Sequence, residues 1–107
     1  MTRWFSTIRT TSVEQIGSGI PTEYGLSQNY PNPFNPTTTI QFDLPKSGFV
    51  SLKVFDLLGR EAATLISEEL DAGYYRSVWK AKVPSGVYFY RIQAGEFSKT
   101  KRLILLK

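Results

Sequence analysis

The side chains that could carry chemistry in this sequence are few. It contains no histidine and no cysteine, so the commonest general base, the thiol nucleophile and the usual zinc ligands are missing. Among its acidic residues only Glu68, Glu69 and Asp71 form a cluster, which is typical of a solvated loop. A glycosidase needs two carboxylates about 5–10 Å apart across a cleft, and a chain of 107 residues offers no obvious cleft. We therefore expect no enzymatic activity, no metal and no cofactor.

Positive charge gathers at the C-terminal end. The last twelve residues hold four bases against one acid, Glu96, and so carry three of the four net positive charges. Such a tail suits nucleic acid, an anionic membrane or an acidic receptor, although the solvated end of a strand has the same composition. Its aromatic residues lack the pattern of an RNA-binding sheet, so we expect no nucleic-acid partner. Its aliphatic run is far too short to cross a bilayer. The four bases are Lys99, Lys101, Arg102 and Lys107.

A proline-rich segment at residues 30–37, YPNPFNPT, organises the chain, and we call it the strap. Three of the six prolines fall within it, and each fixes its own φ at about −65° and pushes the preceding residue toward extended geometry. It therefore cannot be helical or form a central strand. We expect the rings of Tyr30 and Phe34 to anchor it so that it packs over the domain and covers an edge. Its structural residues are predicted to be Tyr30, Asn32, Pro33, Phe34, Asn35 and Pro36.

Beyond the strap, apolar and polar residues alternate with the period of a β-strand. Residues 38–44 and 50–54 each place their apolar side chains on one face, which predicts two half-buried strands. Residues 62–66 and 75–79 predict two more. Residues 86–92, GVYFYRI, are apolar or aromatic on both faces, which indicates a central strand. The expected core residues are Ile40, Phe42, Leu52, Val54, Trp79 and Tyr90.

Turn signals separate these strands. Residues 56–60 predict a turn in which Gly59 takes a positive φ, and residues 68–73 predict an acidic loop. A hairpin at Gly95 leads into a last strand over residues 97–106, and the Tyr88 hydroxyl is expected to bond back to a nearby loop. With a short first strand inside residues 26–30 and no helical periodicity, the pattern predicts an all-β fold, a small antiparallel β-sandwich of about seven strands.

The N-terminal segment is expected to lie outside the compact domain. Residues 2–12 favour β-structure but have no cleanly apolar face, which predicts a weak strand or a loose arm. Residues 17–21, GSGIP, are typical of a flexible linker that ends in a stiff turn. We therefore assign residues 1–21 to an arm and linker and residues 22–107 to one domain. The N-terminus lacks the apolar core of a signal peptide, so any export signal is expected upstream of this sequence.

Several spaced motifs resemble one known family. Together they make residues 20–107 resemble the type A C-terminal sorting domain of the type IX (Por) secretion system. The connection over residues 80–85 differs from the family pattern in two ways. It is shorter than usual, and it has lysines where the family usually has Asp, Asn and Gly turn residues. The motifs are LSQN at 26–29, the strap, VFDLLGR at 54–60, AGY at 72–74, Trp79, SGVYFYR at 85–91, AG at 94–95 and the basic end at 99–107.

This resemblance implies an immunoglobulin-like sandwich that acts as an address label for an upstream cargo. In the family, the cargo reaches the periplasm of a Gram-negative bacterium and the type IX machinery at the outer membrane recognises the label. A sortase-like surface protease commonly removes the domain and attaches the cargo to the cell. The implied location is therefore secreted or cell-surface.

The residues expected to serve recognition come from the family motifs and from the last strand. That strand offers backbone groups for strand addition and basic side chains for charge complementarity. Gly86 and Gly95 are expected to serve backbone geometry more than contact. The full set is Gly86, Tyr88, Gly95, Lys99, Lys101, Arg102 and Lys107.

Two other classes of function stay open at this point. A carbohydrate-binding or adhesion module would need two or three coplanar exposed rings, and Phe49, Phe55 and Tyr74 are the candidates. A structural subunit could insert residues 3–12 as a strand into a neighbour's sheet and build a head-to-tail homo-oligomer. A frayed tail at residues 3–12 is the simpler alternative.

Overall fold

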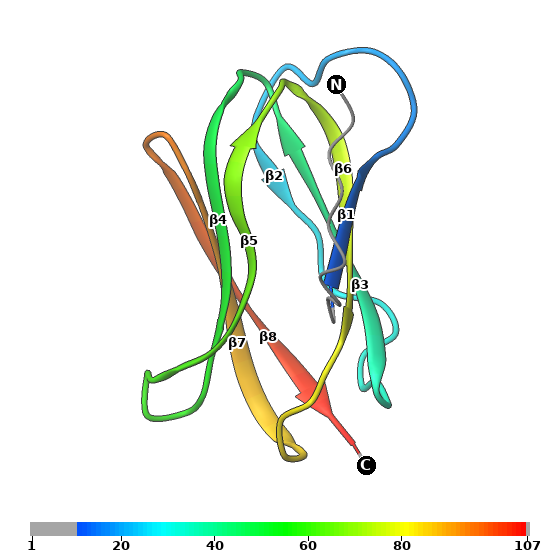
Figure 1. Ribbon diagram of the computed structural model, residues 1–107, viewed down its shortest axis with the longest axis vertical. Coiled ribbons are helices and arrows are strands. Elements are labelled where there is room, and N and C mark those ends of the chain that lie inside the picture. The colour runs from blue at the N-terminus through cyan, green and yellow to red at the C-terminus, as the bar shows by residue number, and fades with distance from the viewer. Residues whose placement is uncertain (1–10, 107) are drawn as a thin grey trace, which may run out of the picture.

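The computed structural model describes residues 11–106 and contains, within that range, eight strands and no helix (Figure 1). This confirms the prediction of an all-β sandwich, with eight strands in place of about seven. The strands are β1 (Thr11–Gln15), β2 (Gly25–Leu26), β3 (Thr37–Leu44), β4 (Gly48–Phe55), β5 (Glu61–Leu70), β6 (Gly73–Lys80), β7 (Gly86–Ala94) and β8 (Phe97–Leu105).

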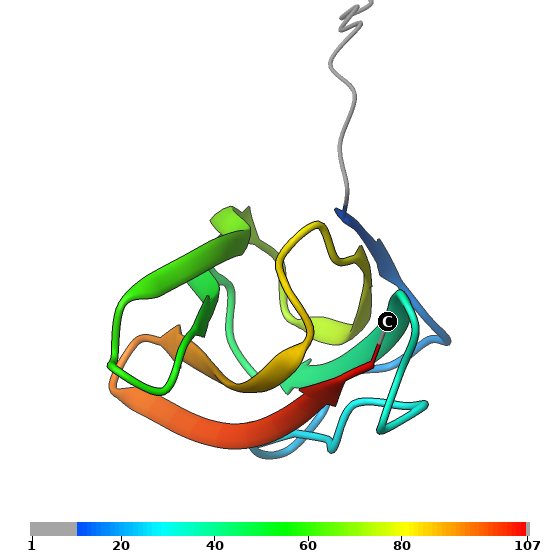
Figure 2. The same cartoon turned by 90° about the horizontal axis from the view of Figure 1, so that it is seen from below.

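The strands form two four-stranded antiparallel sheets that face each other (Figures 1 and 2). Sheet A has the order β1-β6-β3-β2, and sheet B has the order β5-β4-β7-β8. The apolar strand β7 lies between β4 and β8, so its prediction as an interior strand is confirmed. The strand β8 forms one edge of sheet B. One side of its backbone therefore has no neighbouring strand in the sheet, and a partner could reach its N–H and C=O groups there.

The core lies between the sheets because the apolar side chains of each strand point toward the opposite sheet. Alternating residues of β3 are buried from Thr38 to Leu44, and so are alternating residues of β4 from Val50 to Val54. Burial of each large side chain contributes about 1.5–3 kcal/mol. The six residues predicted for the core are all exposed by no more than 2%: Ile40, Phe42, Leu52, Val54, Trp79 and Tyr90.

The predicted acidic loop at residues 68–73 is wrong. The strand β5 continues to Leu70 and β6 begins at Gly73, so only two residues make the turn. Edge strands tolerate charged side chains, including ones on the inner face, so exposed Glu69 and half-buried Glu68 do not end β5. The same strand has two register shifts against β4, and consecutive Leu65 and Ile66 are both buried. A bulge of this kind lets neighbouring residues share one face.

The strand β1 lies within residues 1–21, the segment assigned from the sequence to an arm and linker, where a weak strand or a loose arm is expected over residues 2–12. In the structure β1 pairs in register with β6, and the N–H of Ile16 donates to the carbonyl of Tyr74 at 2.8 Å. Val13 of this strand packs against the core. An edge strand needs no more than that, which explains its weak alternation. Residues 16–24 then cross from this edge of sheet A to the opposite edge at β2. The rest of the predicted arm lies outside the described residues.

The turn between β4 and β5 matches its prediction. Gly59 has a φ of 84°, a conformation that favours glycine. The Asp56 carboxylate accepts hydrogen bonds from the N–H groups of Leu58 and Arg60, both at 2.9 Å. These bonds and the Arg60 guanidinium lower the pKa of Asp56, so the carboxylate stabilises the turn in its charged form.

Candidate recognition surface

The basic residues of the C-terminal end lie on β8, at the edge of sheet B. Lys99 and Arg102 are exposed and Lys101 is half-buried. The ion pairs found in residues 11–106 involve other bases, so these three cations have no acidic partner there. Unpaired charges of one sign attract a partner of the other sign over several ångströms. Lys107 lies outside the described residues.

The strap covers the C-terminal end of this edge strand (Figure 2). Phe34 forms an isolated parallel bridge with Leu105. Its N–H donates to the carbonyl of Ile104 at 3.0 Å, and its carbonyl accepts the N–H of Leu106 at 2.9 Å. The side-chain oxygen of Asn32 accepts the N–H of Ile104 at 3.0 Å. The strap therefore occupies backbone groups that an edge strand would otherwise expose.

Phe34 is the side chain that anchors the strap. Its ring is 2% exposed and lies 5.9 Å from the Trp79 ring, centroid to centroid. Tyr30, the other expected anchor, is 80% exposed, so that expectation is wrong. The backbone of Tyr30 pairs with Thr39 on the edge of β3. Residues directly opposite in a pair point to the same face, and Thr39 points away from the core.

A buried tyrosine ties the start of the strap to the core. The Tyr90 hydroxyl accepts the N–H of Asn29 at 2.9 Å and donates to the carbonyl of Ser27 at 2.7 Å. The Asn29 amide in turn donates to Thr38 Oγ1 at 3.0 Å and to the carbonyl of Pro31 at 3.1 Å. Burial raises the pKa of Tyr90 to about 12, and its bond from Asn29 acts in the opposite direction.

The sequence interpretation did not give Asn29 or Ser27 a role. The signal that could have found them is a tyrosine at an inward position of a central strand. Such a hydroxyl must find a hydrogen-bond partner when buried. Ser27 and Asn29, just before the strap, are the partners that it finds.

Three residues expected in recognition serve the shape of β7. Gly95 has a φ of 60° and opens the two-residue turn between the paired residues Ala94 and Phe97, where a type II′ turn places glycine. Gly86 has a φ of 155°, which side chains rarely adopt. Tyr88 is 7% exposed.

The Tyr88 hydroxyl donates to the carbonyl of Pro84 at 2.6 Å. This is the bond to a nearby loop that the sequence predicts. It fixes the start of β7 against the connection from β6. The hydroxyl therefore takes part in the domain's internal framework.

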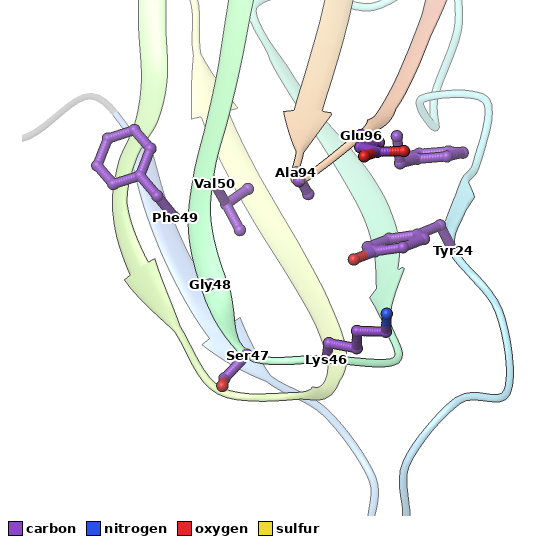
Figure 3. Close-up of a pocket in the computed structure, with 10 residues that line it drawn as sticks. Tyr24, Lys46, Ser47, Gly48, Phe49, Val50, Ala94 and Glu96 are labelled. Atoms are coloured by element: carbon purple, nitrogen blue, oxygen red, sulfur yellow. The ribbon is translucent and has the colours of Figure 1, made fainter.

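An open hollow of about 770 Å³ lies at the end of the sandwich where β7 turns into β8 (Figure 3). Its wall is mostly apolar. The rings of Tyr24 and Phe97 stack there, with 4.9 Å between the ring centroids. Phe49 also lines the hollow, and its ring points away from the ring of Tyr24 (Figure 3). Among residues 11–106, the charged residues that line it are Lys46 and Glu96. This hollow offers apolar contact but no pair of carboxylates for acid–base catalysis.

The acidic cluster does not form a site. Glu68, Glu69 and Asp71 do not line the hollow, and within residues 11–106 no group of three or more acidic residues could hold a metal ion. The backbone carbonyl of Asp71 accepts the Tyr75 hydroxyl at 2.7 Å. This hydrogen bond holds the turn between β5 and β6.

The three rings considered for carbohydrate binding do not share a face. Phe49 and Phe55 lie on the outer side of β4 in sheet B, and Tyr74 lies on the outer side of β6 in sheet A. Their side chains therefore point to opposite sides of the sandwich. A coplanar platform of these three residues is excluded.

A known protein family matches most of this chain. The family model of the secretion system C-terminal sorting domain matches residues 28–106, from just before the strap to the end of β8. The chain belongs to this family. No curated protein matches the sequence.

Membership in this family defines the general role of the domain. A type IX sorting domain is a C-terminal secretion signal, and it marks proteins that are exported across the outer membrane to the cell surface or released. The match includes the strap and β3 to β8, so it contains every contact that covers the end of β8. Residues 11–106 contain no helix long and apolar enough to span a membrane.

Proposed function

We propose that this sorting domain directs an upstream cargo through the type IX secretion system, without catalysing a reaction, and that the machinery recognises its outer rim at β8. The family match carries the proposal. The unpaired bases on β8 support the place of recognition, because charge complementarity raises association rates and rejects partners of the wrong sign. The residues we assign to contact are Lys99, Lys101, Arg102 and Lys107, with Gly86, Tyr88 and Gly95 shaping the strands.

A rigid rim suits a receptor that must accept many different cargos. Such a receptor has to read the label alone, so the label needs one defined shape. The strap contacts at Ile104 hold the end of β8, and the hydrogen bonds of Tyr90 in β7 tie the segment before the strap to the core. Groups held by packing and hydrogen bonds lose little conformational freedom on binding, and this preorganisation increases affinity.

We also propose that a sortase-like surface protease separates the domain from its cargo after export. Residues 17–20 support this, because they are exposed, contain two glycines and connect β1 to β2. Exposed loops with small residues are preferred sites of proteolysis. The expected product is a fragment that begins within this loop, which N-terminal sequencing of the released domain would identify.

The sorting role is tested by fusing the full chain to a periplasmic reporter with a general secretory signal. The fusion is expressed in a type IX-competent strain and in a matched strain that lacks the type IX machinery. We expect protease-accessible reporter on the surface, or reporter in the medium, only in the competent strain. A folded fusion that stays in the periplasm of the competent strain would refute the proposal.

A further inference from the structure

The backbone groups of β8 divide into two sets that face opposite ways. The carbonyl of Arg102, the N–H and carbonyl of Ile104 and the N–H of Leu106 all bond away from β7, to the strap and to the residues just before it. Backbone direction alternates along an antiparallel strand. The N–H and carbonyl groups of Ser98 and Thr100 therefore point away from β7 as well.

These outward groups of Ser98 and Thr100 form a short open window on the edge. No backbone or side-chain partner for them occurs among residues 11–106. At one end the window stops where the side chain of Gln28 donates to the carbonyl of Arg102 at 2.7 Å. At the other end it stops at the turn opened by Gly95. The strap thus leaves room for only a short added strand.

The side chains beside this window are basic. Lys99 and Lys101 alternate with the outward groups and lie on the same face as Phe97 and Leu103. In an antiparallel addition, the residue opposite Lys99 would form a non-hydrogen-bonded pair, in which side chains come closest. Opposite charges in directly facing positions stabilise such a pair.

We propose that the window at Ser98 and Thr100 is the docking edge of the sorting domain, and that it accepts a short extended segment of the secretion machinery with a carboxylate opposite Lys99. This rests on the proposed sorting function. Main-chain hydrogen bonds to the window supply affinity for any extended segment. The carboxylate supplies selectivity, because the neighbouring lysines have no acidic partner within the described part of the chain.

A second copy of this chain fits the same edge poorly. Two β8 strands paired antiparallel through their windows would bring Lys99 and Lys101 of both copies to one place. Like charges directly opposite each other destabilise a strand pair. The charge pattern therefore favours an acidic partner over self-association.

The first test replaces Thr100 with proline in the full-chain fusion. Proline removes an N–H and is tolerated on an edge strand when that N–H faces solvent, so Thr100→Pro blocks the window without breaking a bond to β7. The matched control is Gln15→Pro on the edge of sheet A. Ile16 bonds inward there, so alternation directs the Gln15 N–H outward. We expect Thr100→Pro to reduce surface reporter about ten-fold or more, and Gln15→Pro to leave it unchanged.

The second test reverses the charge beside the window. The double variant Lys99→Glu/Lys101→Glu is compared with Lys80→Glu/Lys82→Glu, which makes the same change in net charge on exposed residues. These residues lie before Gly86, which pairs with Leu105 at the far end of β8 from the window. We expect a loss of about ten-fold or more only in the first variant. Thermal unfolding of each purified chain shows that the variants compared remain folded.

The outcomes separate the docking edge from the sorting function. If the unmodified fusion is not exported, the sorting function fails. If it is exported and the folded Thr100→Pro and Lys99→Glu/Lys101→Glu variants are exported equally well, the docking edge is refuted and the sorting function stands. If the purified chain forms a dimer that Thr100→Pro dissociates, the occupant is a second copy and the acidic segment is refuted.

Discussion

Replacing Tyr90 by phenylalanine tests whether the buried hydroxyl holds the strap to the core. The change keeps the ring and removes the group that binds the N–H of Asn29 and the carbonyl of Ser27. Asn29 is 2% exposed, so its N–H would stay buried without a partner. Leaving one buried donor unsatisfied costs about 1–3 kcal/mol. We expect the free energy of unfolding at pH 8, measured in urea, to fall by that amount.

The pH dependence of the same variant gives a second, independent readout. Folding raises the pKa of Tyr90 from 10.0 to about 12, so its contribution is present below pH 10 and is lost as the pH rises toward 12. This amounts to about 1.4 kcal/mol by pH 11. Because Tyr90→Phe lacks this group, the stability difference between the two proteins should shrink by about that amount between pH 8 and pH 11.

Exposed Tyr30 supplies the matched control for these measurements. Tyr30→Phe removes a hydroxyl that lies outside the core and should leave both the stability and its pH dependence unchanged. All other titrating groups are shared between the proteins and cancel in the comparison. A Tyr90→Phe variant as stable as the unmodified chain at pH 8, or a difference that is constant up to pH 11, would refute the reasoning.

Three further predictions concern single side chains. Phe34→Ala empties the space beside Trp79 and should lower the free energy of unfolding by about 3–5 kcal/mol in urea; a loss below about 1 kcal/mol would show that the strap is not anchored there. Asp56→Asn should flatten the acid side of a stability–pH curve, because folding lowers the pKa of Asp56 below 3.8 and its contribution disappears as the pH falls; an unchanged curve would contradict this. Gly95→Ala should destabilise by about 1–2 kcal/mol because its φ is positive, whereas Gly48→Ala, which meets open space, should change the melting temperature little.

The sequence was sufficient for the parts of the fold that rest on alternation and on turn residues. Ile40 and Phe42 lie two residues apart on a regular strand, so the period alone places them in the core. Gly59 and Gly95 sit at turns that need a positive φ. That the strap is neither a helix nor a central strand also follows from local rules, because its prolines exclude both.

Features that depend on distant contacts could not be read from the sequence. Glu68 and Glu69 look like a loop, yet the pairing of β5 with β4 keeps them in a strand. Tyr30 looks like an anchor until its backbone pairs with Thr39 and turns the ring outward. The closed and open parts of the β8 edge depend on contacts of Gln28 and Asn32 with residues more than seventy positions away, and no local pattern encodes that separation.

The strand β1 precedes the exposed residues 17–20, so under the proposed function it lies on the cargo side of them. A protease that cuts there severs the polypeptide but leaves the five residues of β1 hydrogen-bonded along β6. The two products would stay associated until that strand peels off the sheet. Breaking the chain and setting the cargo free are then separate events, and the stability of one edge pairing sets the delay between them.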